Sequence, residues 1–401
     1  MKAAILPKLL LALVLGVCAA QPARAELLGN AESQKLVSEG HALHAAGKYK
    51  EALDKFEAAR KLSPEASSPL SSAAFVLQNL LPGLPQEAAA KAREQAGGLA
   101  RAALKLAAND PLAAEVLRML DDPMSVSAFK PNAEAEKAYT EGEALFHKGE
   151  YAAARARYRA AQLADPRFSA AFLMEGDTYF MEKNWLAAEM LFNKATEVDP
   201  LNAQAWRFLA DTMARLGNRA GLENAAVNAV AAQPSQLPSW DRLAAVARLD
   251  GKPLTRLQLV RLATVSLDQK TGKATINLAE QFREAKVETN TDYAVWLAYA
   301  LAQANALTTA AKEGRTLSPF AVEQAGWSTA LKVAGELQEK GAPPLASPVL
   351  QALRGLKSAA DVEAAILLLM YREAFRPELE AWKKAHPDGI REFVAAHRLM
   401  P

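Results

Sequence analysis

The fold is decided by two consecutive blocks, SAAFLMEGDTYFMEKNWLAAEMLFNKATEVDP at residues 169–200 and LNAQAWRFLADTMARLGNRAGLENAAVNAVAAQP at residues 201–234. Small and bulky residues recur between them with a period of 34 residues, and each block ends on a proline. The block just upstream matches in the same way, so that Gly142, Gly176 and Ala210 share one position. A period of this length predicts helix-turn-helix units that stack into a solenoid.

The order of residues within each block resembles the tetratricopeptide repeat (TPR) family, whose unit has this length. A further full repeat covers residues 33–64. There we expect Gly40 and Ala52 to let two helices approach closely, and Phe56 to fill the space between helix pairs. Pro64 ends the second helix because its ring cannot continue the hydrogen-bond ladder. The resemblance implies that the repeats form a binding platform.

The regions that flank the clear repeats are also helical in pattern. Residues 67–121 are predicted to hold a degenerate pair whose second helix, at 87–107, is unusually long. A loop is predicted at 121–131, before the main array. The array is expected to close with an amphipathic helix at 239–249, because a terminal repeat must cover the exposed face of the last pair.

The character of the sequence changes after residue 250. Branched residues at 257–267, a Thr271-Gly272 turn and the alternation at 274–278 predict a β-hairpin. Further helices are predicted at residues 291–311, 318–340, 346–356, 359–374, 377–385 and 388–397. No 34-residue match and no family resemblance occurs in residues 250–401.

Together these patterns predict an all-α fold: a right-handed helix-turn-helix solenoid of TPR-type repeats, then a small β-hairpin and a C-terminal helical domain. The predicted parts are a signal peptide at 1–25, an N-terminal TPR with degenerate helical pairs at 26–122, the main TPR array with its capping helix at 132–250, the hairpin segment at 251–290 and the C-terminal domain at 291–401.

The N-terminus has the pattern of a secretory leader. Lys2 and Lys8 precede an apolar run at 9–20, and the Ala-Arg-Ala triplet at 23–25 offers small residues where a signal peptidase cleaves. Cleavage before Glu26 is predicted. The run is about a dozen residues, short of the roughly 20 that span a bilayer. We therefore expect a periplasmic or secreted protein without a transmembrane segment in its mature form.

The single cysteine, Cys18, lies within this predicted leader. Its surroundings resemble a bacterial lipobox, but Val17 stands where a small residue is normal, so lipoprotein anchoring is the less favoured alternative. Removal of the leader would leave a mature chain with no thiol, and its stability would owe nothing to disulfides.

Charge and motifs argue against several functions. The 47 basic and 45 acidic residues are interspersed, which gives no electrostatic case for nucleic acid. No nucleophile motif, phosphate-binding loop, dinucleotide fingerprint or metalloprotease pair occurs. The sequence therefore predicts no catalytic residues, no cofactor and no metal. We expect a non-enzymatic interaction scaffold of the cell envelope. The alternative is an enzyme or small-ligand domain at 250–401, with the repeats as a targeting arm.

The TPR resemblance implies that the first helix of each pair lines a concave groove, and it assigns groove residues by position. These are Glu136, Tyr139, Glu143, Phe146, His147, Leu173, Asp177, Phe180, Met181, Arg207, Asp211 and Arg215. An acidic line of Glu143, Asp177 and Asp211 would run beside an apolar patch. Such a groove suits a protein partner, through an extended or helical peptide with apolar anchors and a basic residue. In the alternative interpretation the rings pack on neighbouring helices and the acids are only solvated.

Three other features carry weaker hypotheses. His41 and His44 share a predicted helix face at a spacing that suits a metal, but no further ligands stand nearby, so surface histidines are the favoured interpretation. The apolar run at 362–371 is expected to be a buried core helix. The aromatic and basic residues at 371–377, next to Trp382, could form a binding surface, and a packed helix end is the favoured alternative.

Overall fold

The structure, a computed structural model, describes residues 27–45, 47–81, 84–107, 110–121, 129–268 and 270–401. These residues fall into two compact units. The first contains the helices before residue 123 together with residues 258–260, and the second contains the remainder of the chain. The predicted leader at 1–25 and most of the predicted loop at 121–131 lie outside the described residues.

The first unit is built from helix pairs. Its helices are α3 (Ala31–Ala45), α4 (Tyr49–Leu62), α5 (Ser68–Leu80), α6 (Gln86–Leu106) and α7 (Pro111–Asp121). The pair α3 and α4 is the predicted repeat at 33–64, and a Cβ atom on Gly40 would lie 2.5 Å from the Phe56 ring. Helix α6 extends over 21 residues, which confirms the prediction of an overlong second helix.

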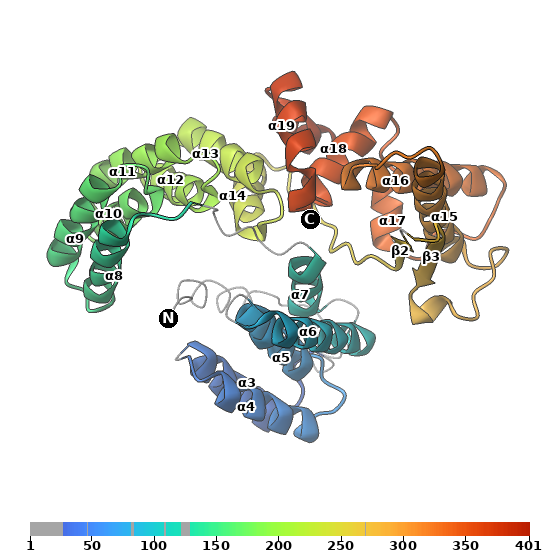
Figure 1. Ribbon diagram of the computed structural model, residues 1–401, viewed down its shortest axis with the longest axis horizontal. Helices are drawn as coiled ribbons and strands as arrows, with labels where there is room; N and C mark the ends of the chain where they lie inside the picture. Colours follow the sequence, from blue (N-terminus) through green and yellow to red (C-terminus); the bar gives the residue numbers. More distant parts are fainter. Residues whose placement is uncertain (1–26, 46, 82–83, 108–109, 122–128, 269) are drawn as a thin grey trace. The chain divides into compact units, whose positions relative to one another are not determined.

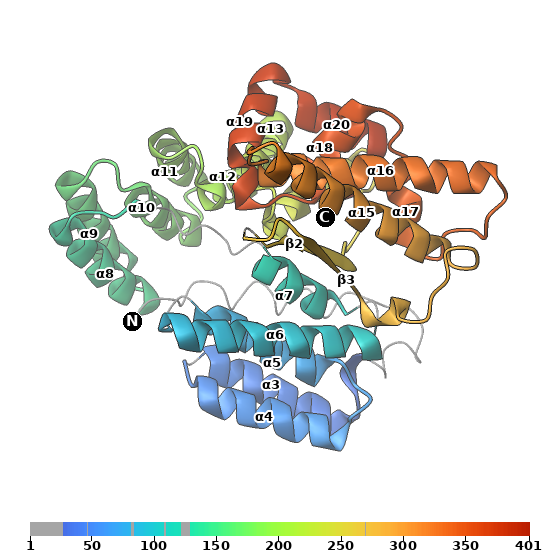
Figure 2. The same cartoon turned by 45° about the vertical axis from the view of Figure 1, so that its right-hand side comes forward.

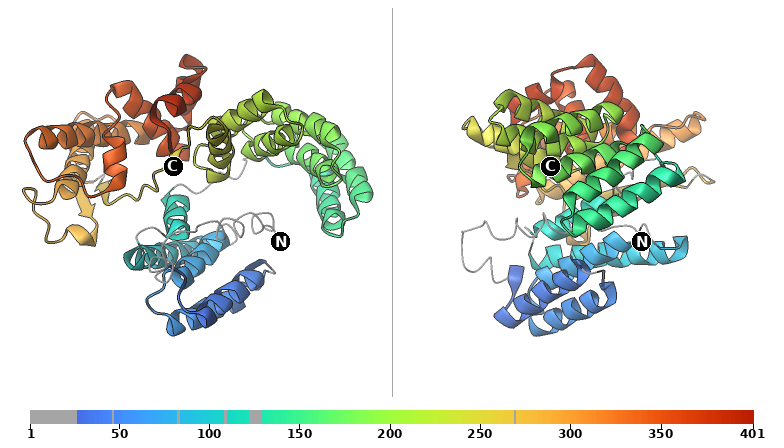
Figure 3. Two further views of the ribbon diagram at one scale, coloured as in Figure 1. Left: turned by 180° about the vertical axis from the view of Figure 1, so that it is seen from behind. Right: turned by 90° about the vertical axis from the view of Figure 1, so that its left-hand side faces the viewer.

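The second unit begins with the main array. Its helices are α8 (Ala133–His147), α9 (Tyr151–Ala164), α10 (Ser169–Met181), α11 (Trp185–Val198), α12 (Ala203–Arg215), α13 (Arg219–Ala232) and α14 (Leu237–Leu249). The pairs stack side by side into a curved array, with α8, α10, α12 and α14 on its inner side and α9, α11 and α13 on its outer side (Figure 1; seen from behind in Figure 3). This is the predicted right-handed solenoid of TPR-type repeats.

Close helix contact explains the repeated small residues. A Cβ atom on Gly142 would lie 2.6 Å from Tyr158 Cε1, and one on Gly176 would lie 2.7 Å from Phe192 Cε1. Both rings are fully buried, so they have no free space into which to retreat. The glycine and the ring therefore fix how closely the two helices of each pair approach.

The turn inside each pair requires a left-handed backbone. Gly149 and Gly217 take φ values of 80° and 70° there, and in the intervening repeat Lys183 has a φ of 62°. Glycine adopts this region without the steric cost that a Cβ atom brings. Lys183 is thus the one position of the three at which the turn carries a side chain.

Helix α14 is the first helix of another repeat unit. Trp240 Nε1 donates to the Pro234 carbonyl at 2.8 Å, and Trp206 Nε1 makes the equivalent bond to the Pro200 carbonyl at 2.9 Å. The predicted capping helix therefore begins two residues before 239, at Leu237, and it keeps the geometry of the helices that precede it.

The C-terminal domain combines a small hairpin with helices. Its elements are β1 (Thr255–Arg256), β2 (Ala263–Leu267), β3 (Ala274–Leu278), η2 (Glu280–Phe282), α15 (Thr291–Lys312), α16 (Pro319–Glu339), α17 (Pro348–Leu353), α18 (Ala359–Leu369), η3 (Glu373–Phe375), α19 (Arg376–Ala385), α20 (Gly389–His397) and β4 (Leu399–Met400). Strands β2 and β3 pair in antiparallel register as predicted, with Val265 opposite Ile276, and they lie against α15 (Figure 2).

Two features of this domain differ from the sequence prediction. Helix α18 is buried as expected but ends at Leu369 rather than at 374, because the backbone leaves the helical region and η3 follows. Near the end of the chain, β4 pairs in parallel with β1, placing Thr255 opposite Leu399. Both strands have only two residues, too few for alternation to show in the sequence.

A buried ion pair ties the hairpin to the domain core. Glu323 on α16 is 3% exposed. Its Oε1 accepts hydrogen bonds from Arg261 at 3.3 Å and from Trp327 Nε1 at 2.9 Å. Burial alone would raise the pKa of Glu323, but Arg261 and Arg372 outweigh it and hold that pKa below its usual value.

The C-terminal domain contacts the last outer helix of the array. Arg376 donates to the Ala232 carbonyl at 2.7 Å and to Gln233 Oε1 at 2.5 Å, and Lys383 donates to the Ala231 carbonyl at 3.3 Å. These cations lie at the C-terminus of α13, where a helix leaves carbonyl groups unpaired. The segment 371–377, considered above as a binding surface, is therefore used in part for contact within the chain.

Candidate functional site

The candidate site lies on the inner face, which we define as the side of the array formed by α8, α10, α12 and α14 (Figure 1). Glu143, Asp177 and Asp211 occupy one position in α8, α10 and α12, each 34 residues from the next. The shared period places the three carboxylates on equivalent turns of neighbouring inner helices. Their surroundings nevertheless differ.

The first two carboxylates form no ion pair within the described part of the chain. Glu143 Oε1 accepts a hydrogen bond from the Tyr158 hydroxyl at 2.6 Å, and burial raises the pKa of Glu143 against the opposing effects of this bond and of His147. Burial, and then the charge of Glu143, raise the pKa of Asp177 to about 6. The pair therefore concentrates negative charge at a half-buried position.

The third carboxylate is neutralised within the chain. Asp211 accepts hydrogen bonds from Arg242 on α14, from Nε at 3.1 Å and from Nη2 at 2.7 Å. Arg207 lies close by and is bonded to Gln236 and to Ser239 Oγ, the latter at 3.4 Å. Burial, with the charge of Arg242, lowers the pKa of Arg207 to about 10. Of the three carboxylates in the predicted acidic line, Asp211 thus pairs with a cation of the chain, while Glu143 and Asp177 form no ion pair among the described residues.

Half-buried aromatic rings accompany the open carboxylates. Tyr139 contacts Phe168 with ring centroids 4.9 Å apart, and burial raises its pKa. Phe146 contacts Tyr151 at 5.4 Å, and Phe180 meets Trp185 edge to face at 4.9 Å. The rings thus pack on neighbouring residues, as the alternative interpretation holds, and all remain partly exposed.

The remaining predicted groove residues divide by exposure. Leu173 is 3% exposed and lies in a core cluster with Leu209. Its assignment to the groove is wrong, because its aliphatic side chain fills the space between the repeats. Met181 is 52% exposed. Glu136, His147 and Arg215 are exposed, and Arg215 lies over the Trp185 ring.

Two site residues were missed by the sequence prediction. Tyr158 was not among the predicted groove residues, yet its hydroxyl donates a hydrogen bond to Glu143. Arg242 lies in the capping helix, which was not aligned with the repeats. Its repeat-equivalent positions are Phe208 in α12 and Met174 in α10, each 34 residues apart, and this spacing is the signal that could have identified it.

The histidines on α3 are packing residues. His41 Nε2 lies 3.0 Å from Ser72 Oγ and its ring contacts Phe56, while His44 contacts Phe75. Burial, and then the charge of His44, lower the pKa of His41 to about 4. Both rings are half-buried against neighbouring helices and keep part of their surface exposed. Among the described residues, no cluster of His, Cys, Asp and Glu is suited to hold a metal.

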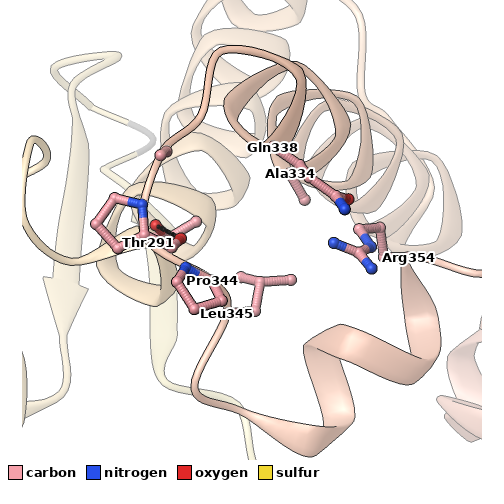
Figure 4. Close-up of a pocket in the computed structure, with 8 residues that line it drawn as sticks. Thr291, Ala334, Gln338, Pro344, Leu345 and Arg354 are labelled. Carbon is pink, nitrogen blue, oxygen red and sulfur yellow. Dashed lines mark hydrogen bonds between the residues drawn. The ribbon is translucent and has the colours of Figure 1, made fainter.

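The C-terminal domain contains a small cavity between α15, α16 and α17 (Figure 4). Thr291, Gln338, Leu345 and Arg354 contribute to its lining, and its volume is about 120 Å³. Ligand pockets of proteins are commonly about 300–1,000 Å³. This cavity is therefore small for an organic substrate.

The helix pairs and the inner face define a helical-repeat protein of the TPR type. No protein-family model matches the chain, and no curated protein matches it. Among the described helices, none combines the length and the apolar character needed to cross a membrane.

Several solved structures of TPR proteins are similar to this chain. The first TPR of Spaghetti (RPAP3), bound to the HSP90 peptide SRMEEVD, is 17% identical with a TM-score of 0.28, and the match covers 31% of this chain and 99% of that one. YrrB, a TPR protein with an unusual peptide-binding site, is 17% identical with a TM-score of 0.25, covering 56% and 98%. A thermophilic TPR protein of Thermus thermophilus is 19% identical with a TM-score of 0.25, covering 54% and 99%. The repeat fold assigned above rests on the helix pairs themselves.

Proposed function

We propose that the array of residues 133–249 is a non-enzymatic interaction scaffold that binds a peptide or helical segment of a partner protein on its inner face. The observation that carries this proposal is the pair of half-buried carboxylates, Glu143 and Asp177, which forms no ion pair in the described part of the chain. Structural carboxylates at such depth are usually paired. An unpaired couple on a concave surface instead favours a ligand that brings the missing positive charge.

The neighbouring apolar groups support a peptide as the ligand. Phe146 and Phe180 remain partly exposed, and Met181 is 52% exposed. Aromatic residues and methionine are enriched in protein interfaces, where a few central residues supply most of the binding energy. The acids make capture of a free peptide carboxylate unfavourable, so an internal segment with a basic residue is the fitting ligand.

The pattern at the N-terminus supports a role for this activity in the cell envelope, after export and cleavage before Glu26. In this setting the repeats would hold together components of an envelope assembly. N-terminal sequencing of the processed protein tests the export step. A lipid-blocked Cys18 at the new terminus would contradict cleavage before Glu26 and favour the lipoprotein alternative.

The alternative of a ligand-binding C-terminal domain is less well supported. The cavity beside Arg354 is about 120 Å³ (Figure 4), and Arg376 and Lys383 are bonded to the end of α13. The domain thus contributes contacts that close the array, which fits a scaffold.

Affinity capture from envelope extract tests the proposed function. Full-length protein carrying Asp177→Lys is compared with Glu197→Lys, a matched charge reversal on the outer helix α11, where Glu197 is 66% exposed. We expect Asp177→Lys to lose the partners that wild type and Glu197→Lys retain, with a changed salt dependence of capture. Equal capture by all three proteins would contradict binding at the inner face.

A further inference from the structure

We infer that the inner face selects an arginine side chain of its partner and holds the guanidinium group at Asp177 and Glu143. This inference rests on the proposed function and specifies its ligand. It comes from the internal symmetry of the array, because the same carboxylate position occurs three times and the chain itself occupies one of the three with a guanidinium.

The occupied position is Asp211. Arg242 approaches it with two parallel hydrogen bonds, Nε to Oδ1 at 3.1 Å and Nη2 to Oδ2 at 2.7 Å. The Arg242 side chain is 15% exposed, and its Nη1 also donates to the Pro238 carbonyl at 3.0 Å. This two-pronged geometry matches a guanidinium to a carboxylate in a way that an ammonium cannot reproduce.

The two other positions lack an equivalent cation. The residue that corresponds to Arg242 in spacing is Phe208 for Asp177 and Met174 for Glu143. Phe208 packs edge to face on Phe192 at 5.5 Å, and Met174 is 5% exposed. Neither can neutralise a carboxylate. The carboxylate thus occurs in three consecutive repeats, whereas a guanidinium at the position of Arg242 occurs only for Asp211.

The surroundings of the open pair favour arginine over lysine. The Tyr139 ring is partly exposed and lies 5.7 Å from the buried ring of Tyr158, whose hydroxyl donates a hydrogen bond to Glu143. Planar guanidinium groups stack on such rings while their N–H groups reach carboxylates, and they lose less hydration than an ammonium does. A partner arginine can therefore pair with the carboxylates and stack on the exposed part of the Tyr139 ring.

Capped pentapeptides that differ at one residue test the inference. The probes are acetyl-Leu-Phe-Xaa-Leu-Phe-amide with arginine, lysine or citrulline at Xaa, titrated against the full chain by calorimetry. Citrulline keeps the shape of arginine without its charge, and lysine keeps the charge without the fork. We expect the arginine peptide to bind at least about tenfold more tightly than the other two, because citrulline brings no charge to the carboxylates and lysine cannot form the two parallel hydrogen bonds.

The variants Asp177→Asn and Glu143→Gln should each remove about tenfold or more of the arginine preference. Glu197→Gln, on the outer helix, should leave all three affinities within about twofold. Circular dichroism verifies that each variant is folded.

Two results would overturn the inference. If arginine and lysine peptides bind equally and Asp177→Asn weakens both, the site recognises any cation, and the proposed function survives while the inference fails. If no peptide binds, or if Asp177→Asn changes nothing, the guanidinium site does not exist. The capture experiment above then decides the proposed function separately.

Discussion

Replacing Asp177 with asparagine should stabilise the array while it weakens binding. The pKa of Asp177 is raised to about 6 in the folded protein, against about 3.9 in an unfolded chain. A difference of about two pH units corresponds to at most roughly 3 kcal/mol, and solvent screening reduces this to on the order of 1–2 kcal/mol. Asparagine removes the charge and keeps the shape, so the free energy of unfolding should rise by that amount at neutral pH.

The pH dependence of this effect has a definite sign. A carboxyl group whose folded pKa is raised binds protons more tightly in the folded state, so ionisation at higher pH destabilises the fold. The advantage of Asp177→Asn should therefore be complete above about pH 6 and decline as the pH falls, until it vanishes below about pH 4. Binding of a basic partner should weaken over the same range, because the protonated Asp177 no longer attracts it.

Urea unfolding followed by tryptophan fluorescence measures this effect in the correct part of the molecule. All six tryptophans lie between residues 185 and 382, so the signal reports the second unit alone. Asp211→Asn is the matched control at the equivalent position. It removes an acceptor of two Arg242 bonds and should destabilise by about 1–3 kcal/mol. If Asp177→Asn destabilised to a similar extent, or if its effect were the same at pH 7.5 and pH 4.5, the electrostatic account of the site would be refuted.

Other predictions concern packing, turns and anchors. Gly142→Ala should destabilise by roughly 1 kcal/mol, since overpacking against a ring at 2.6 Å exceeds the gain in helix propensity. By contrast Gly335→Ala, in a helix with open space around that position, should stabilise by up to about 1 kcal/mol. If the urea midpoints of Gly142→Ala and Gly335→Ala shifted in the same direction, the predicted clash of residue 142 with the Tyr158 ring would be excluded. Lys183→Gly should raise the free energy of unfolding by about 1 kcal/mol by relieving the left-handed turn, and a lower melting temperature would contradict this. Met181→Ala should reduce partner affinity with no loss of stability, whereas Phe180→Ala should reduce both. Calorimetry measures the affinity of each variant and thermal melts measure its stability. Unchanged affinity in both variants would show that Phe180 and Met181 are not part of the binding site.

The repeat architecture was predictable because it depends on close contacts that few residues satisfy. Gly142 and Tyr158 occur together since any Cβ atom would meet the ring, and this pairing returns with the 34-residue period. The hairpin was predictable for a similar reason, because β2 and β3 alternate and a Gly-containing turn joins them. By contrast, the pairing of β1 with β4 joins residues 144 positions apart, Thr255 with Leu399, and leaves no local pattern.

The site was predicted only in outline. Position in the repeat identified the three carboxylates, but it could not show which of them has a partner. That depends on Arg242, one helix further along, and on whether α14 continues the repeat geometry. Leu173 shows that repeat position can also mislead. Its position predicted a groove residue, but its aliphatic side chain is buried with Leu209.

The differences between the three carboxylates follow from where the array ends. At the last repeat Arg242 donates hydrogen bonds to Asp211 on the inner face, and Arg376 donates to the Ala232 carbonyl at the end of α13. A terminal repeat must satisfy its exposed groups without a following neighbour, and here arginines of the chain do so at both places. The repeats that carry Glu143 and Asp177 are each followed by another helix pair that packs against them, and this leaves their carboxylates available to a cation from outside. The same requirement that ends the solenoid therefore confines the candidate binding site to α8 and α10.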